Sequence, residues 1–310
     1  MKLLGMLKML QGAGVAAQDH APEAAPDLKG MLLHHLLDSN EIELEVLGRG
    51  FTIDLTKYAI PPVHLGQFTI DFSPTKHIVF LFLAAILCLA VFLPVGRAMK
   101  GKYKDRAPHG MANAMEAMVV YFRDEVVRRN IGHGADAYTG YILTLFFFIL
   151  SMNVLGLVPF GSTPSGNFMV TGALALVTLV VVEISGMRAL GFQGYMRTIF
   201  YAPEGLNPVG QVIMLIILTP VEFLGKLTKP FALMIRLFAN MLAGHTLVLS
   251  LLGMIFMFAS AGMIVASGVA VASVTMVIAI MLLEVFVALL QAYIFAMLTA
   301  VFIGLIRHAH

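Results

Sequence analysis

Residues 237–306 read LFANMLAGHTLVLSLLGMIFMFASAGMIVASGVAVASVTMVIAIMLLEVFVALLQAYIFAMLTAVFIGLI, and their only ionisable side chains are His245, Glu284 and Tyr293. A helix needs about 20 apolar residues to cross the hydrocarbon core of a bilayer. The tract is therefore long enough for two long tilted helices or for three conventional spans. Small residues gather at 259–268, where we expect the turn before the last helix.

The composition of the whole chain points to a membrane protein as well. Of its 310 residues, 59% are hydrophobic and only 12% are charged, about half the charged share of an ordinary globular protein. A soluble fold cannot bury so much apolar surface, and a disordered chain would not contain it. The net charge of +2 does not indicate a nucleic-acid partner, and the single Cys88 excludes an intramolecular disulfide.

Three more charge-poor stretches have the length of membrane spans. They are Ile78–Val95, Tyr138–Phe160 and Phe168–Met187, of which only the last contains an acid, Glu183. With the last two helices, taken as long and tilted, we expect an all-α integral membrane protein of about five transmembrane helices. Residues 97–106 contain five basic side chains, and the positive-inside rule places such a cluster in the cytoplasm.

Residues 111–130 combine an apolar and a charged face at helical spacing. The apolar positions are Met115, Met118, Val119, Phe122 and Val126. This pattern predicts one amphipathic helix on the cytoplasmic surface of the membrane. A helix that faces only solvent is the alternative.

The N-terminal region differs from the rest of the chain. Residues 1–76 hold nine of the 18 acidic residues, and we assign them as an acidic outer extension that precedes a membrane domain at 77–310. The first 17 residues resemble a weak signal peptide, although Lys8 within the apolar run fits an amphipathic start equally well. EIELEV and FTIDLT alternate on either side of LGRG, which predicts a small β-hairpin at about 41–56.

Charged groups at membrane depth mark the candidate functional site, because each costs about 2.5–3.5 kcal/mol on insertion scales. Glu222, Lys229 and Arg236 are spaced seven residues apart, and Asn240 follows four residues later. At about 100° per residue these four form a polar stripe on one helix face, whereas His245 lies on a different side.

The last helix repeats this pattern. Glu284 and Gln291 are seven residues apart and share a face, and Tyr293 points elsewhere. Arginine stays protonated at any accessible pH, whereas histidine titrates near neutrality. A fixed cation, Arg236, beside the titratable His245 and Glu284 is what a proton path requires.

Simpler interpretations stand beside this one. Arg236 could pair with Glu222 or Glu284 as a structural contact, and Glu183 could be a helix-packing acid. A metal site at His245 and Glu284 would have only two ligands and is not favoured. Six other histidines are expected at the surface: His34, His35, His64, His77, His308 and His310.

The run ALMIRLFANMLAGH at 232–245 closely resembles the signature of subunit a of F-type ATP synthase, in the membrane Fo sector of the bacterial type. Other runs match the same family in the same order: MNVLGLVPF, TPSGNFMVT, EFLGKLTKP and LLQAYIFAMLTAVFIG. The resemblance covers the chain from about Ser73 to the C-terminus. It implies a proton-channel stator subunit with two offset half-channels that couple proton flow to c-ring rotation.

The resemblance also implies roles for particular residues. Arg236 corresponds to the family's invariant arginine, which faces the c-ring carboxylates and blocks a direct proton path. Asn240 and Gln291 correspond to the polar residues that flank it. His245 and Glu284 stand where many bacterial members carry Glu and His respectively, which supports a contact between them.

Half-channel residues follow from the same comparison of motifs. Asn167, together with His245 and Glu284, would line the entry half-channel from the outer side, and Glu222 resembles the acid of the cytoplasmic half-channel. Gly225 and Ala232 stand where small hydroxyl residues are common in the family, which leaves the exit path less defined.

The implied partners are the c-ring, subunit b of the peripheral stalk and membrane lipids, with no nucleic acid, nucleotide, cofactor or metal. The chain would lie in the bacterial inner membrane with its N-terminus outside and its C-terminus in the cytoplasm, and it would not be catalytic alone. The coupling ion, proton or sodium, is expected to depend on the c-ring. A stand-alone secondary transporter or ion channel is the alternative, and an intramembrane metalloprotease is disfavoured because HExxH is absent from the sequence.

Overall fold

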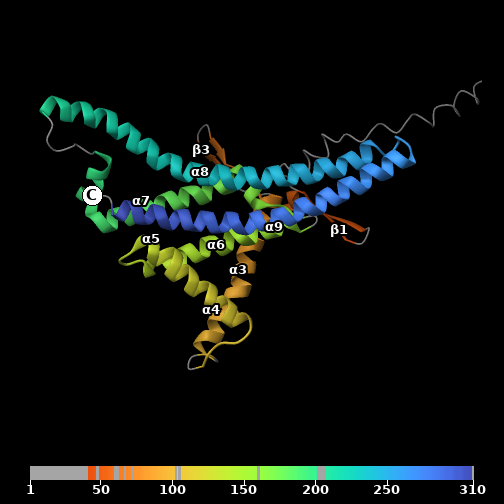
Figure 1. Cartoon of the computed structure of the whole chain (residues 1–310), viewed down its shortest axis with the longest axis horizontal. Helices are drawn as coiled ribbons and strands as arrows, with labels where there is room; N and C mark the ends of the chain where they lie inside the picture. The colour runs from red at the N-terminus through yellow and green to blue at the C-terminus, as the bar shows by residue number, and fades with distance from the viewer. Residues whose placement is uncertain are drawn as a thin grey trace, which may run out of the picture. The chain divides into compact units, whose positions relative to one another are not determined.

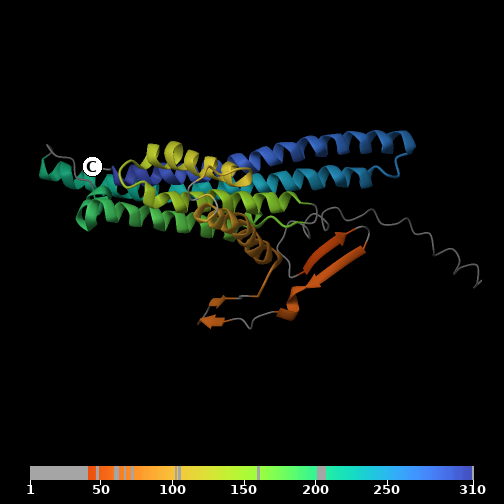
Figure 2. The same cartoon turned by 90° about the horizontal axis from the view of Figure 1, so that it is seen from below.

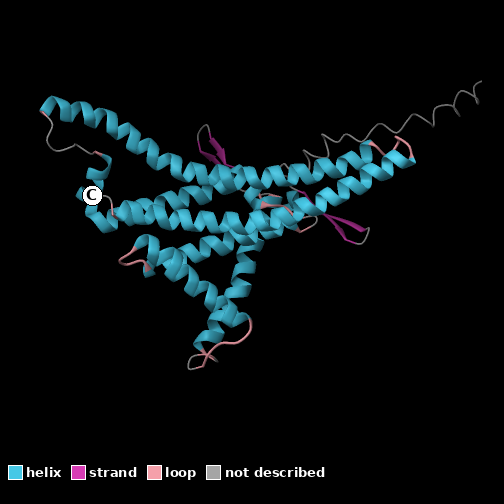
Figure 3. Ribbon diagram, viewed as in Figure 1, coloured by secondary structure: helices cyan, strands magenta, loops and turns pink. Residues whose placement is uncertain are grey.

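The computed structural model describes residues 41–46, 49–58, 63–65, 68–70, 73–101, 103, 106–158, 161–200 and 207–308, most of which are helical (Figure 3). They fall into two compact units. One contains residues 246–278, and the other contains the described residues up to 245 together with 279–308. The signal-peptide pattern of residues 1–17 lies outside the described residues.

Two short antiparallel hairpins precede the first membrane helix. β1 (Glu41–Val46) pairs with β2 (Arg49–Asp54), and β3 (Val63–Leu65) pairs with β4 (Phe68–Ile70). A single 3₁₀ turn, η1 (Leu55–Tyr58), follows β2. The hairpin predicted at about 41–56 is therefore present. The second hairpin was not predicted, because strands of three residues are too short to show an alternating pattern.

Five described helices are long and apolar enough to cross a membrane, which confirms the predicted number. They are α3 (Lys76–Lys100), α6 (Asp136–Leu157), α7 (Phe168–Ile199), α8 (Pro208–Met257) and α9 (Met263–Arg307). The long apolar tract forms parts of α8 and α9, which have 50 and 45 residues. The alternative of three conventional spans is therefore wrong.

The turn between α8 and α9 lies at residues 258–262 and so overlaps the first half of the small-residue run at 259–268, where it was predicted. α9 already begins at Met263, directly after Gly262, whose φ of 94° favours glycine. Small residues alone do not end a helix. The hydroxyl of Ser267 donates to the carbonyl of Ile264 at 3.1 Å, so this polar side chain is satisfied inside α9.

The predicted amphipathic helix consists of α4 (Met111–Tyr121), a π-helical segment η2 (Phe122–Arg128) and α5 (Arg129–Ile131). The wider turn of the π-helix directs two consecutive residues, Val126 and Val127, into the core. Phe122 packs against Phe146 of α6, with ring centroids 4.5 Å apart. The apolar side of this segment is thus covered by the membrane helices.

Ion pairs occupy the outer face of the same segment. Arg128 contacts Asp124 and Asp136, each at 2.9 Å. Arg123, through its hydrogen bond to Asp124, and Arg128, through its charge, hold the pKa of the Asp124 carboxyl below its usual range. Exposed pairs of this kind contribute little to stability, so the apolar contacts fix the position of the segment.

Helices α6, α7 and the C-terminal part of α9 run alongside one another (Figures 1 and 2). Their facing sides, together with residues of α8, form the core of the larger unit. The most buried side chains of this core include Ile142, Ile149, Leu237, Phe295 and Ile303. The end of α9 is fastened to the turn before α6, because Arg307 Nη2 donates to the carbonyl of His133 at 2.7 Å. A Cβ at Gly304 would collide with the Asn130 carbonyl, so this close approach requires glycine.

Helix α7 is interrupted at Gly191, whose φ of 71° and ψ of 169° are essentially restricted to glycine. In a continuous helix, Glu183 and Tyr195 would lie about 18 Å apart along the axis. Instead, the Tyr195 hydroxyl donates a hydrogen bond to the Glu183 carboxylate. The break therefore directs the last turns of α7 back towards Glu183.

Candidate functional site

The four residues of the polar stripe all lie on an exposed side of α8. Glu222, Lys229, Arg236 and Asn240 are exposed. The buried side of α8 is formed by Leu233, Leu237 and Met241, and at about 100° per residue it lies roughly a quarter turn from the stripe. The stripe is therefore accessible to another chain beside the helix bundle.

Arg236 has no hydrogen bond or ion pair with another residue in the part of the chain that the structure describes. The interpretation in which it pairs with Glu222 or Glu284 is therefore wrong for the isolated chain. Arginines at membrane depth almost always pair or face a water-filled cavity, because an unpaired charge there is costly. A carboxylate on a neighbouring chain would supply the missing partner.

His245 of α8 and Glu284 of α9 face each other, as the sequence suggests. His245 Nδ1 lies 3.5 Å from Glu284 Oε1. Gly244 permits this approach, because a Cβ there would overlap the Glu284 carboxyl group. Glu284 and Gln291, predicted to share a face, are both buried, and Asn240 Nδ2 donates to Gln291 Oε1 at 3.1 Å. Two polar contacts thus join the same two helices.

Thr163 is a site residue that the sequence did not single out. It is buried in the loop between α6 and α7, and its hydroxyl is hydrogen-bonded to His245 Nε2. Gly156 of α6 leaves the necessary space, because a Cβ at that position would overlap the Thr163 side chain. Thr163, His245 and Glu284 therefore form an ordered row from the loop to α9. Its position in the hydroxyl-rich TPSGN run was the available signal.

The loop that carries Thr163 is fixed by further hydrogen bonds. Ser165 Oγ donates to Asn153 Oδ1 at 2.7 Å, and Asn153 Nδ2 donates to the Ala288 carbonyl at 3.3 Å. Asn167, predicted to line the outer half-channel, caps α7 by accepting a hydrogen bond from the Met169 backbone at 2.8 Å. Asn167 therefore helps to hold the loop, and Thr163 makes the contact with His245.

His77 was expected at the surface, and this prediction is wrong. Its side chain is buried at the start of α3, and its Nδ1 is hydrogen-bonded to Ser162 Oγ at 2.6 Å. The partner lies 85 residues away in the sequence, so local pattern carries no sign of it. The contact ties α3 to the residue next to Thr163.

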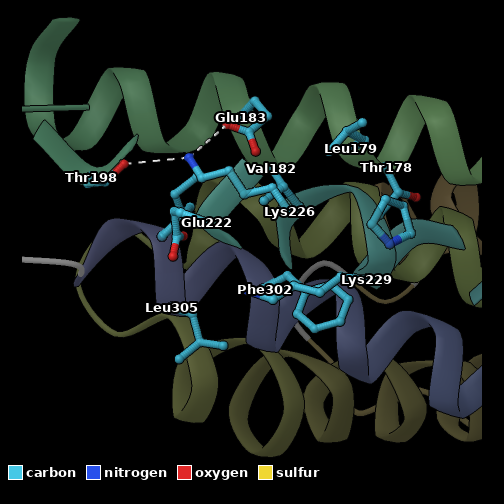
Figure 4. Close-up of a pocket in the computed structure, with 12 residues that line it drawn as sticks. Thr178, Leu179, Val182, Glu183, Thr198, Glu222, Lys226, Lys229, Phe302 and Leu305 are labelled. Atoms are coloured by element: carbon cyan, nitrogen blue, oxygen red, sulfur yellow. Dashed lines mark hydrogen bonds and ion pairs between the residues drawn. The ribbon is translucent and has the colours of Figure 1, made fainter. Parts of the chain in front are cut away.

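Glu222 lines a cavity of about 90 Å³ together with Lys226 and Lys229 (Figure 4). Lys226 was not among the predicted site residues. Its Nζ lies 3.6 Å from the Glu183 carboxylate of α7, so Glu183 links α7 to α8, in agreement with its interpretation as a helix-packing acid. The four-residue spacing of Glu222 and Lys226 was the sequence signal that places both on one helix face.

Comparison with known proteins identifies a matching family. The family model described as "ATP synthase A chain" matches residues 78–304. An ATP synthase subunit a of Chloroherpeton thalassium is 42% identical over 273 residues, which cover 88% of this chain and 75% of the relative. An ATP synthase subunit a 2 of Chlorobaculum tepidum is 40% identical, covering 95% and 77%. A subunit a of Anaeromyxobacter dehalogenans is also 40% identical, covering 96% and 77%.

Proposed function

Because this chain belongs to the ATP synthase A chain family, and is thus a multi-pass membrane subunit of F-type ATP synthase, we propose that it provides two offset proton half-channels beside a rotating c-ring. Arg236 forms the barrier between them. The observation that carries this proposal is the exposed Arg236 on the polar stripe of α8, which has no ion pair or hydrogen bond among the described residues. The chain transfers protons and performs no bond chemistry of its own.

The entry half-channel uses Thr163, His245 and Glu284, close to Asn167. The two nitrogens of His245 face different partners, with Nε2 towards Thr163 and Nδ1 towards Glu284. An imidazole can take up a proton at one nitrogen and release another from the second. Glu284 Oε1 accepts no hydrogen bond from the described residues and is free to receive that proton. Glu284 then passes it to a ring carboxylate.

The exit half-channel uses Glu222. A ring carboxylate that returns to the stripe after nearly a full turn meets the Arg236 guanidinium, which favours its ionised form, and its proton leaves through Glu222. Each proton that crosses the membrane releases about 2.3 kcal/mol per 100 mV of potential. Asn240 and Gln291 flank the arginine and hold α8 against α9 at this level.

The positions of the basic residues support an orientation. The cluster at residues 97–106 and the C-terminus would lie in the cytoplasm of a bacterial cell. The acidic N-terminal extension would lie outside the membrane. The expected protein partners are the c-ring at the stripe and subunit b of the peripheral stalk.

The orientation of the stripe gives a direct test. Lys229 and Leu227 are both exposed on α8 but point about 160° apart. In a Cys88→Ser background, we expect a benzophenone maleimide attached to Lys229→Cys to cross-link to the ring subunit within the purified complex. The same probe on Leu227→Cys should not form this product. Mass spectrometry of the cross-linked band identifies the partner.

The paired design separates orientation from general proximity. Equal cross-linking from both positions, or cross-linking from Leu227→Cys alone, would show that the stripe does not face the ring.

A further inference from the structure

The cavity beside Glu222 has walls of three kinds. Helix α7 contributes Thr178, Glu183 and Thr198, and α8 contributes Lys226 and Lys229 besides Glu222. Helix α9 contributes only apolar side chains, Phe302, Leu305 and Ile306. The two carboxylates and the two ammonium groups balance in charge. This balance does not suit an anion or cation site, but it suits a small polar chamber that exchanges protons.

Lys226 is held by several contacts at once. Its Nζ lies 3.6 Å from Glu183 Oε2 and 3.5 Å from Thr198 Oγ1, as the dashed lines of Figure 4 show. The same ammonium group lies 4.4 Å from the centre of the Tyr195 ring. The side chain is only 13% exposed. Its charge is therefore fixed in place on the wall of the cavity.

Helix geometry places the Cβ atom of Lys226 near that of Glu222. Residues four apart on a helix have Cβ atoms about 5–6 Å apart and lie on the same face. Lys229, the other cation of the cavity, is exposed and sits 5.7 Å from the Phe302 ring. Lys226 is thus the less exposed cation of the pair, and its contacts hold it in place.

A buried ion pair is weak evidence for a purely stabilising role. Taking two charges out of water costs about as much as their attraction returns, and apolar replacements are often neutral or favourable. The glycine-only break at Gly191 adds a further partner to the pair, because it brings Tyr195 to Glu183. The arrangement therefore fits a role for the charge of Lys226 at the cavity.

We propose that Lys226 is a positioning residue of the exit half-channel. Its positive charge, held in place by contacts with Glu183 and Tyr195, controls how readily Glu222 takes up and releases protons. This inference rests on the proposed function of Glu222 as the exit acid. The ammonium group of this lysine contacts Glu183, Thr198 and Tyr195 of α7. Further polar groups of the exit path thus come from α7.

The two members of the ion pair should act in opposite directions. Lys226→Gln removes a cation of the cavity and leaves the Glu183 carboxylate, so the cavity should still admit protons from a more alkaline medium than in the wild type. Glu183→Gln leaves the cation of Lys226 unopposed, so proton entry into the cavity should fail at a lower pH of the medium. A unit charge about 5–6 Å away, partly screened by water, should move the pH at which pumping declines by about 0.5 to 1 pH unit.

The experiment uses inverted membrane vesicles that carry the complete complex. Their cytoplasmic side faces the medium, so ATP-driven pumping draws protons from the medium through the exit half-channel. The initial rate of pumping, divided by the rate of ATP hydrolysis, is measured against the pH of the medium. The alkaline limb of this profile is the pH range in which pumping declines as the pH rises. We expect it to move to higher pH for Lys226→Gln, to lower pH for Glu183→Gln, and to move little for Lys226→Arg.

The direction of the shifts decides the outcome. A structural role would lower the rates of both variants and leave the alkaline limb in place, and shifts in the same direction would also overturn the proposal. Either of these contradicting results overturns only the role of Lys226, provided that wild-type vesicles pump and Arg236→Ala vesicles do not. If pumping survives in Arg236→Ala vesicles, the proposed function itself fails.

Discussion

Replacement of Arg236 by alanine is expected to abolish ATP-driven proton pumping while the complex still assembles. The guanidinium is exposed and has no partner among the described residues, so its removal leaves no gap in the packed core. What is lost is the fixed positive charge that separates the half-channels and favours ionised ring carboxylates. Fluorescence quenching of a pH-sensitive dye in inverted vesicles measures the effect.

Two control variants separate charge from shape. Arg236→Lys keeps a cation, but the ammonium group loses its proton more easily in an apolar setting and lacks the planar donor fork. We therefore expect it to retain only a small part of the pumping. Leu227→Ala, on the opposite side of α8, should pump like the wild type. Coupled pumping at the wild-type level in Arg236→Ala would refute the assignment.

Exchange of His245 and Glu284 by double substitution is expected to restore more pumping than either single substitution. A positioned proton-transfer group contributes typically 10²–10⁴-fold, so His245→Glu and Glu284→His should each reduce pumping by about 100-fold or more. In the double variant the carboxylate faces Thr163 and the imidazole lies beside Gly244, so a direct acid–histidine pair is retained. Pumping rates of the four proteins form a double-mutant cycle.

Independent sites would give a different result in this cycle. If the losses of the two single variants simply add in free energy, His245 and Glu284 do not act as a pair. Gly244 must stay glycine in all four proteins, because any Cβ at this position would displace the side chain at 284.

Periodicity in the sequence predicts much of the fold and part of the site. The apolar stretches predict five membrane helices, because length and charge decide whether a segment can cross a bilayer. The seven-residue spacing of Glu222, Lys229 and Arg236 predicts their common exposed face, since neighbouring turns of one helix fix that geometry. The same logic places Glu284 and Gln291 together on α9.

Contacts between distant segments were beyond this reasoning. Thr163 reaches His245 because Gly156 leaves space for it and the loop hydrogen-bonds to Asn153 of α6, which in turn donates to α9. Lys226 reaches Glu183 from another helix, and Tyr195 joins them because α7 breaks at Gly191. None of these relations follows from local spacing. They depend on how separate helices pack.

The central claim is that this chain conducts protons only when a c-ring lies beside it. A measurement of passive proton flux into liposomes tests this claim most directly. Liposomes with a potassium diffusion potential would contain either the purified chain alone or the membrane sector with the chain and its ring. We expect the chain alone to conduct no faster than protein-free liposomes, and the membrane sector to conduct measurably. Addition of the ring to the same chain preparation should restore flux, which shows that the chain is intact. Rapid flux through the chain alone would contradict the account and identify a stand-alone channel or transporter.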